Sequence, residues 1–584
     1  MAWQSNIVAP DPACSSVHME AEEKVRVNLL NPLKPRSTHG FGRLEAMSLI
    51  VYSVILIWAV SHHAAWYDEA QAWLLARSCT LADLFYQRLH YEGHPGLWYL
   101  LLWVEARLHA SYQWMQYIAV FIAVSGMYVW LRFNPLPRVL SLLLPFTFFF
   151  LYQYAVIARS YVLLPLLAFS LMALYQNRQS SPWLFCIVAS LLANCQLHML
   201  AVAVGLAGLY GYDRWKLLRQ RETPFAARQF AAPLLCMLLS VGIATATAWP
   251  AFDGSAASGP VVDLLRGHAA TPVQTAPELS DSQSSLKARF VRRILANHPR
   301  EAKWMEGRLS SRGLTTQALL EDLLERAEAL VIGITVPVST SNALAVIFLL
   351  LLAVNLWAER LLIALLPWAL VLLAFFVIWG RSHHTGVVWV AIVCSLWMIS
   401  LRPVPNDWVS HLRTSLYAFS LLLFVLQIGW TVHCLSSEIH SPYSPDKDTA
   451  RYLEQLPKGA RVAAFDYDSV TVNAWLPRSL YVNHHFDYAL SNRNTELISN
   501  MNRTLTTRPD YVTIAEYIET APPYNTSTRT TAPRVTRYDP PDMPNKLEEL
   551  GYRETNRFCG EHVFRNYSEF TECRLIYRLE NAGL

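Results

Sequence analysis

The stretch AMSLIVYSVILIWAVSHH, residues 46–63, decides the fold class of this chain. It contains no Asp, Glu, Lys or Arg. An uncharged apolar run of about 18 residues is long enough to cross the hydrocarbon core of a bilayer as one helix. Residues 1–45, which precede it, are polar and basic and do not resemble a cleavable signal. The run is therefore predicted to be an uncleaved membrane anchor that follows a cytoplasmic tail.

The rest of the sequence has the same apolar character. Hydrophobic residues make up 53% of the chain and charged residues only 16%, whereas soluble domains carry about 25% charged residues. We therefore predict a polytopic α-helical membrane protein whose first partner is the lipid bilayer. The net charge of +4 is not gathered into basic runs interleaved with aromatic residues, so a nucleic-acid partner is not expected.

The positive-inside rule predicts which apolar blocks cross the membrane. The basic segments 1–45 and 213–230 both belong in the cytoplasm, which requires that one block between them does not span. Residues 95–109 hold Glu105 and Arg107 among aromatic residues, so they are predicted to lie in the interface. About eleven spans remain within a transmembrane domain at 46–433. The blocks are 46–63, 112–131, 139–156, 160–176, 182–196, 199–212, 231–249, 339–357, 361–379, 385–401 and 415–433.

The same topology places three tight turns outside the cytoplasm, near Ile157–Tyr161, His198 and Arg381–His384, together with three longer segments. The longer segments are residues 64–111, the long loop 250–338 and the C-terminal region 434–584. A helix is expected within the long loop, at Thr315–Val331.

The region 434–584 is predicted to be a small soluble α/β domain. A helical pattern at Asp448–Leu456 precedes segments that alternate like strands. The strand-like segments are Arg461–Phe465, Tyr511–Ala515, Glu561–Arg565 and Arg574–Leu579. Cys559 and Cys573 lie in this region, and the sequence leaves open whether they form a disulfide.

The acidic pair Asp68-Glu69 is the first candidate for chemistry. It follows the first span in YDEAQAWLLAR, residues 67–77, and begins a predicted interfacial helix over 68–79. Two carboxylates are common as solvated groups at a helix N-terminus. The predicted topology, however, puts several cationic or titratable side chains on the same face of the membrane. They are Arg159, His198, Arg381, His383 and His384.

Such a set fits transfer of a group from a phosphate-linked donor. Side chains at the ends of spans usually extend to the interface without a further role. A carboxylate, however, can take the proton of an attacking hydroxyl. Arg or protonated His can stabilise the charge that builds on a departing phosphate.

These features resemble the GT-C superfamily of membrane glycosyltransferases, and most closely the bacterial relatives of protein O-mannosyltransferases and of the aminoarabinose transferase. The resemblance is carried by the first span, the Asp68-Glu69 pair, the stretch YEGHPG at 91–96 and ARSYVLLPLL at 158–167. Many relatives read HPP where this chain has His94-Pro95-Gly96.

The resemblance implies roles for these residues. Asp68 would be the catalytic base, with Glu69 assisting or orienting it. The donor would be a polyprenyl-phosphate sugar whose phosphate lies near Arg159, with Arg381 as a second candidate. The other candidates for binding donor phosphate or substrate are His94, His198, His383 and His384. No cofactor is assigned, and a divalent metal is left open.

The leading hypothesis is an inverting hexosyl or pentosyl transferase whose acceptor is a glycan, a lipid or a protein outside the cytoplasm. A transporter or flippase of lipid-linked glycans is the alternative, and a non-catalytic scaffold is the third possibility. A transporter predicts ionisable residues in mid-span, whereas the charges here gather at span ends. The expected location is a bacterial inner membrane with the site facing the periplasm, or the ER membrane in a eukaryote. The Asp466-Tyr467-Asp468 tripeptide in the outer region is expected to be structural.

Overall fold

The computed structural model describes most of the helices and strands of the chain. The described residues are 41–175, 178, 181–219, 224–249, 320, 342–362, 366–377, 385–466, 468–484, 488, 501–519, 535–540, 542–562 and 570–580. Residues 1–40 and Arg381–His384 lie outside them. The predicted loop 250–338, with its helix Thr315–Val331, also lies outside them except for residue 320.

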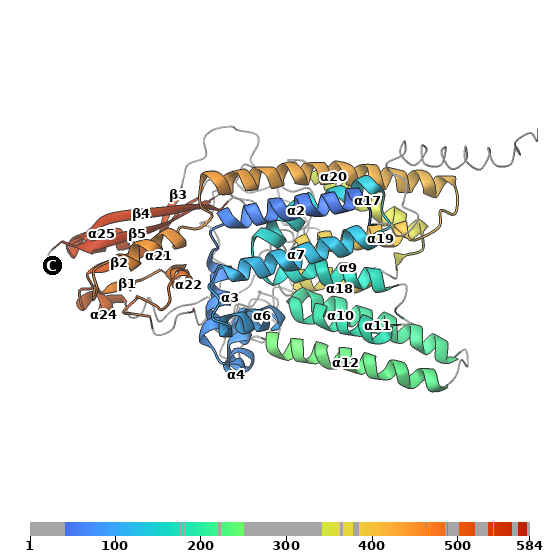
Figure 1. Ribbon diagram of the computed structural model, residues 1–584, viewed down its shortest axis with the longest axis horizontal. Coiled ribbons are helices and arrows are strands. Elements are labelled where there is room, and N and C mark those ends of the chain that lie inside the picture. Colours follow the sequence, from blue (N-terminus) through green and yellow to red (C-terminus); the bar gives the residue numbers. More distant parts are fainter. Residues whose placement is uncertain are drawn as a thin grey trace, which may run out of the picture.

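A bundle of apolar helices forms the larger part of the structure, with a small sheet domain at one end (Figure 1). Its helices are α2 (Arg43–His62), α7 (Trp114–Phe133), α9 (Leu163–Tyr175), α10 (Pro182–Cys195), α11 (Leu197–Arg219), α12 (Pro224–Ala248), α17 (Asn342–Ala358), α18 (Leu366–Val377), α19 (Thr385–Ser400) and α20 (Asp407–His440). Between α7 and α9 the chain is helical but irregular. This part consists of α8 (Arg138–Leu143), the 3₁₀-helices η2 (Leu144–Phe146) and η4 (Ser160–Val162), and the π-helix η3 (Phe149–Val156).

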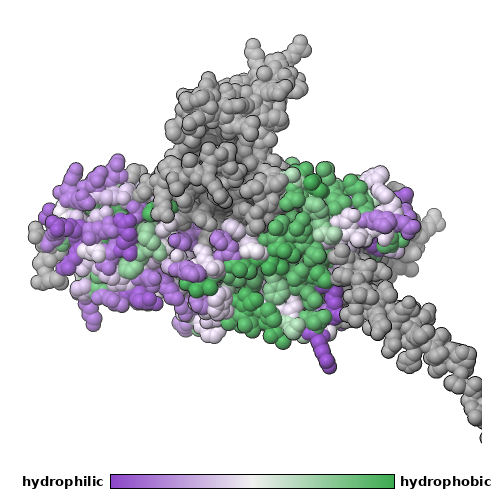
Figure 2. Space-filling model, turned by 90° about the horizontal axis from the view of Figure 1, so that it is seen from above, coloured by the Kyte–Doolittle hydropathy of each residue, from purple (hydrophilic) through white to green (hydrophobic). Residues whose placement is uncertain are grey.

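Among the described residues, five helical segments are long and apolar enough to cross a membrane. They are Arg43–His62, Trp114–Phe133, Arg138–Val156, Ala231–Ala248 and Asp407–His440. Large apolar side chains such as Ile50, Val54 and Phe121 point away from the bundle and are more than half exposed. Figure 2 shows the resulting hydrophobic surface over part of the helix bundle, whereas the sheet domain is mostly hydrophilic. Apolar surface on this scale suits lipid rather than water, so the predicted class of helical membrane protein agrees with the structure.

The block 95–109 contains a helix that is too short to span. The helix α6 (Leu97–Arg107) has 11 residues, a length of about 16 Å at 1.5 Å per residue. The hydrocarbon core of a bilayer is about 30 Å thick. Together with α3 (Tyr67–Ser78), α4 (Leu81–Asp83), η1 (Leu84–Arg88) and α5 (Leu89–Glu92), α6 lies at the end of the bundle that faces the sheet domain (Figure 1). This placement fits the predicted interfacial helix.

The C-terminal part, which we call the outer domain, is an α/β domain built around one mixed sheet. Its elements are α21 (Asp446–Glu454), β1 (Val462–Ala464), η9 (Asp468–Thr471), α22 (Val472–Trp475), α24 (Met501–Thr506), β2 (Tyr511–Glu519), β3 (Val535–Asp539), α25 (Met543–Glu549), β4 (Tyr552–His562) and β5 (Phe570–Leu579). Along one edge of β2, β1 pairs parallel with Tyr511–Thr513 and β3 pairs antiparallel with Ala515–Glu519. Along the other edge β5 pairs antiparallel with β2, and β4 pairs with β5.

The alternation of side chains along the strands gives the sheet two apolar faces. Val512, Ile514 and Leu575 pack on one face with Leu547 of α25. Ile576, whose side chain points the other way, packs on the opposite face with α21. Successive residues of a strand point to opposite faces, so both layers of helices find an apolar surface.

The structure changes three details of the sequence-based expectation. The helix α20 continues to His440, beyond the predicted end of the membrane domain at residue 433. The strand β3 was not expected, and the predicted strand Glu561–Arg565 begins earlier, as β4 at Tyr552. A short polar strand such as VTRYD is recognisable mainly by its pairing with β2, and pairing cannot be read from local sequence.

A disulfide joins Cys559 to Cys573, which face each other across β4 and β5. The two cysteines are 14 residues apart, and closing a loop of that size stabilises a fold by about 3 kcal/mol. We expect the Cys559→Ser/Cys573→Ser variant to melt at a lower temperature when unfolding is followed by tryptophan fluorescence. Cys236→Ser, at an exposed free cysteine of α12, is the control. Equal melting of the double variant and the wild type would contradict the expectation.

Candidate active site

The helix α3 presents the acidic pair Asp68-Glu69 in its first turn. Trp66 is the N-cap, and its backbone N–H donates to Glu69 Oε2 over 3.2 Å. This contact satisfies one of the amide donors left free at a helix start, where a carboxylate is also favoured by the helix dipole. The predicted helix over 68–79 is thus present, and its start fixes the direction of both acidic side chains.

The other end of α3 is attached to the outer domain. The guanidinium of Arg77 donates to the carbonyl oxygens of Leu476 and Asn473, over 2.8 and 3.2 Å. Tyr112 packs between Trp73 of α3 and Trp475 of α22. The acidic helix therefore has fixed contacts with the outer domain as well as with the bundle.

Asp68 forms an ion pair with Arg159, so the two residues lie on the same face, as the predicted topology has them. Asp68 Oδ2 is 3.0 Å from Arg159 Nη1, and the side chains are 25% and 14% exposed. Arg159 lies between η3 and η4, and its guanidinium also covers the ring of Tyr161. A carboxylate and a cation thus meet near the start of α3, and both side chains are partly exposed.

Glu69 differs from its neighbour because it is fully buried. Its Oε1 accepts the backbone N–H of Ala158 over 2.7 Å, and its Oε2 lies 3.0 Å from His63 Nε2. With the Trp66 amide, these contacts occupy both carboxylate oxygens. Of the two roles that the family resemblance implies for Glu69, its surroundings fit orienting.

Glu92, at the end of α5, is a second carboxylate near Asp68 that the sequence reasoning missed. Its oxygens accept hydrogen bonds from Gln71 Nε2 and from Tyr99 Oη, over 3.0 and 3.1 Å. Burial raises the pKa of Glu92, the two hydrogen bonds lower it, and the nearby charge of Asp68 raises it further. The sequence feature that could have indicated a role for Glu92 is its position two residues before His94 in YEGHPG.

His94 lies in the same cluster, but not as a cation. Burial, helped by the charges of Arg159 and His198, lowers the pKa of His94 to about 4. Its ring is therefore neutral at pH 7, and its buried Nδ1 has no hydrogen-bond partner among the described residues. His198 is buried, with its Nδ1 3.1 Å from Gln196 Oε1. The positive charge beside Asp68 therefore comes from Arg159 and not from His94.

The comparison with known proteins gives one result. No protein-family model and no curated protein matches this chain. The chemistry of the site therefore has to follow from its own geometry.

Three of the candidate residues cannot be placed with this cluster. Arg381, His383 and His384 lie outside the described residues. Across the described ranges no group of three or more His, Cys, Asp or Glu side chains could hold a metal ion. The described cluster consists of Asp68, Glu69, Glu92, His94, Arg159 and His198.

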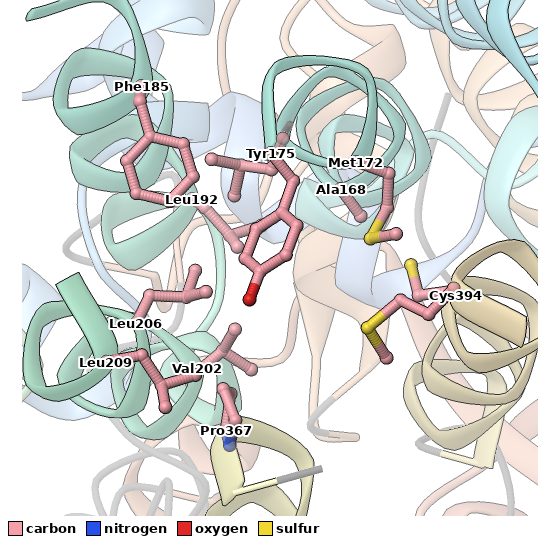
Figure 3. A pocket seen from close by; sticks show the side chains of 12 residues that line it. Ala168, Met172, Tyr175, Phe185, Leu192, Val202, Leu206, Leu209, Pro367 and Cys394 are labelled. Atoms are coloured by element: carbon pink, nitrogen blue, oxygen red, sulfur yellow. The ribbon is translucent and has the colours of Figure 1, made fainter. Parts of the chain in front are cut away.

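A small apolar cavity lies elsewhere in the bundle, between α9, α10, α11, α18 and α19. Figure 3 shows Tyr175, Phe185, Leu206 and Cys394 around it. Its volume is about 40 Å³, which is too small for a sugar substrate. None of the candidate residues that the structure describes lines this cavity, so it is separate from the cluster around Asp68.

Proposed function

We propose that the chain is a GT-C type inverting glycosyltransferase. It would move a hexosyl or pentosyl group from a polyprenyl-phosphate donor to a glycan, lipid or protein acceptor outside the cytoplasm. The observation that carries the proposal is the pair of Asp68 and Arg159, 3.0 Å apart and both partly exposed, at the end of an apolar helix bundle. The buried partners of Glu69 support it, because they hold the chain on both sides of that pair.

The reaction assigns a separate task to each side chain. The acceptor hydroxyl oxygen attacks the anomeric carbon of the sugar while the bond from that carbon to the phosphate oxygen breaks. The hydroxyl proton passes to the Asp68 carboxylate. The electron pair of the broken bond leaves with polyprenyl phosphate, whose added negative charge is stabilised by Arg159. A guanidinium has five N–H donors, so Arg159 can contact Asp68 and a phosphate oxygen together.

The lipid tail of the donor explains the position of the site. A polyprenyl chain stays in the hydrocarbon core, so its phosphate is available only where membrane helices end. We place about eleven spans in the membrane, with the site and the outer domain on the outer face of a bacterial inner membrane or in the ER lumen. The Cys559–Cys573 disulfide supports this orientation, because disulfides persist in oxidising compartments.

Transfer can be tested with the full-length protein in liposomes. The donors are undecaprenyl-phosphate mannose, glucose and arabinose with radiolabelled sugars, and membranes of the source cell supply the acceptor. We expect one of the three donors to release undecaprenyl phosphate while its label appears in acceptor material. A flippase would instead bring intact donor to the opposite leaflet, and neither release nor transfer from any donor would contradict the proposal. Liposomes without protein are the control.

A further inference from the structure

His63 lies directly after α2 and is buried between two carboxylates. Its Nε2 is 3.0 Å from Glu69 Oε2 and its Nδ1 is 2.9 Å from Glu438 Oε1, with only 2% of the residue exposed. Both ring nitrogens must carry a proton to donate to both carboxylates, which is the positively charged form of the ring. Burial lowers the pKa of His63, but the two carboxylates outweigh it and raise the pKa to about 10.

The two carboxylates that bind His63 are themselves connected through further hydrogen bonds to η3 and to the segment that follows it. Glu438, in the last turns of α20, also accepts the hydroxyl of Tyr152 from η3, over 2.7 Å. The chain of η3 leads on to Ala158, whose N–H donates to Glu69. We call His63, Glu69, Glu438 and Tyr152 the imidazolium clamp. It joins α2, α3, η3 and α20 through side chains that water does not reach.

The outer domain covers the clamp. The ring of Tyr443 lies 5.1 Å from His63 and 4.6 Å from His562 of β4, which also contacts Trp66. His562 is itself bound to Glu572 of β5, over 2.8 Å. The titratable groups that face His63 are thus Glu69, Glu438 and Tyr443, with Tyr152, His562 and Glu572 behind them. Shielding from water strengthens the contacts between the imidazolium and its carboxylates.

We propose that His63 is a positioning residue for the transfer reaction, which it serves by holding Glu69 against Ala158. The inference rests on the proposed glycosyl transfer. Glu69 is the neighbour of Asp68 and Ala158 is the neighbour of Arg159, so the clamp lies one residue from each member of the reacting pair. Displacing a reacting group by about 1 Å can lower a rate by about 100-fold.

The experiment compares His63→Gln with His62→Gln in the full-length protein. His62 is the adjacent histidine, is exposed, and has its hydrogen bonds within its own helix, to Trp58 and Ser61. With the donor found active in liposomes, we expect His63→Gln to lower kcat by about 10- to 100-fold, the effect of losing the group that holds a reacting side chain in place. We expect KM to stay within about twofold. His62→Gln keeps wild-type values.

Glu438→Gln provides an independent variant. It leaves His63 paired with Glu69 alone, so no unpaired buried charge is created and folding is expected to survive. If the clamp acts as a unit, Glu438→Gln lowers kcat, and the double variant with His63→Gln is no slower than His63→Gln alone. Monodisperse elution from size-exclusion chromatography in detergent shows which variants are folded. If His63→Gln does not fold, the kcat of Glu438→Gln tests the positioning role.

The outcomes separate this inference from the function on which it rests. Wild-type kcat in a folded His63→Gln, or in Glu438→Gln if only that variant folds, overturns the positioning role. Full activity in Asp68→Asn would instead overturn the transfer mechanism.

The clamp also predicts a dependence of stability on pH. The pKa of His63 is raised in the folded protein to about 10, from an ordinary value of about 6.5. Its contribution to stability is therefore complete below about pH 6.5 and is lost as the pH rises toward 10. We expect the melting temperatures of the wild type and His63→Gln to differ most at pH 6 and to converge by pH 10. A difference that does not change with pH contradicts a charged clamp.

Discussion

We expect Asp68→Asn to lower the rate of the proposed glycosyl transfer by about 10²- to 10⁴-fold, the contribution that a general base makes. The amide keeps the size of the side chain but cannot take the proton from the acceptor hydroxyl. The donor does not depend on that proton transfer for binding, so its KM is expected to change little. The measurement is the initial rate of label transfer in liposomes, with protein amounts matched.

The chain offers a matched control for this variant. Asp213 pairs with Arg178 over 2.7 Å, and its side chain is 28% exposed against 25% for Asp68. It lies on α11, 15 residues beyond His198, roughly 22 Å along the helix. Asp213→Asn therefore removes a similar carboxylate at a distance from the site, and we expect it to transfer at the wild-type rate. Equal rates for Asp68→Asn and Asp213→Asn would exclude Asp68 as the base.

Arg159→Met is expected to lower kcat by about 10²- to 10³-fold, because the departing phosphate loses the cation that stabilises its charge. The affinity for undecaprenyl phosphate should fall as well, which can be measured by native mass spectrometry. Arg159→Lys keeps the charge but not the planar arrangement of donors, so we expect an intermediate rate.

Arg178→Met is the matched control for this second variant, because Arg178 is 19% exposed and is also paired with an aspartate. We expect it to change neither kcat nor the binding of undecaprenyl phosphate. If Arg159→Met bound undecaprenyl phosphate as tightly as the wild type, Arg159 would not be the phosphate ligand.

The broad features of the molecule were predictable because each leaves a local trace in the sequence. The charge-free run at 46–63 is sufficient to indicate a spanning helix, and the structure places α2 there. The acidic pair at the start of α3 follows from the preference of carboxylates for helix N-termini. The meeting of Asp68 and Arg159 could be expected from counting spans, because the count determines which loops share a face.

The remaining features depend on contacts that no local pattern contains. His63 is one of two adjacent histidines, and the sequence does not show that it contacts Glu438, which lies 375 residues later. His94 was expected among the groups that bind phosphate, but its charge is decided by burial, which the sequence does not show. The disulfide could not be predicted from the sequence, because it depends on the register of β4 against β5, which pairs Cys559 with Cys573. Asp466, the first residue of the tripeptide at 466–468, is buried beside Arg574 of the outer domain, which fits the structural role expected for it.

The distance along the chain between His63 and Glu438 has a consequence for biosynthesis. The helix with Asp68 leaves the ribosome early, and Arg159 follows after fewer than a hundred residues. The carboxylate that completes the support of Glu69 arrives only with the last turns of α20. A nascent or truncated chain that stops before α20 thus holds Asp68 and Arg159 but lacks Glu438, the last member of the clamp. We therefore expect the proposed transfer to become possible only late in synthesis, when nearly the whole membrane domain has been inserted.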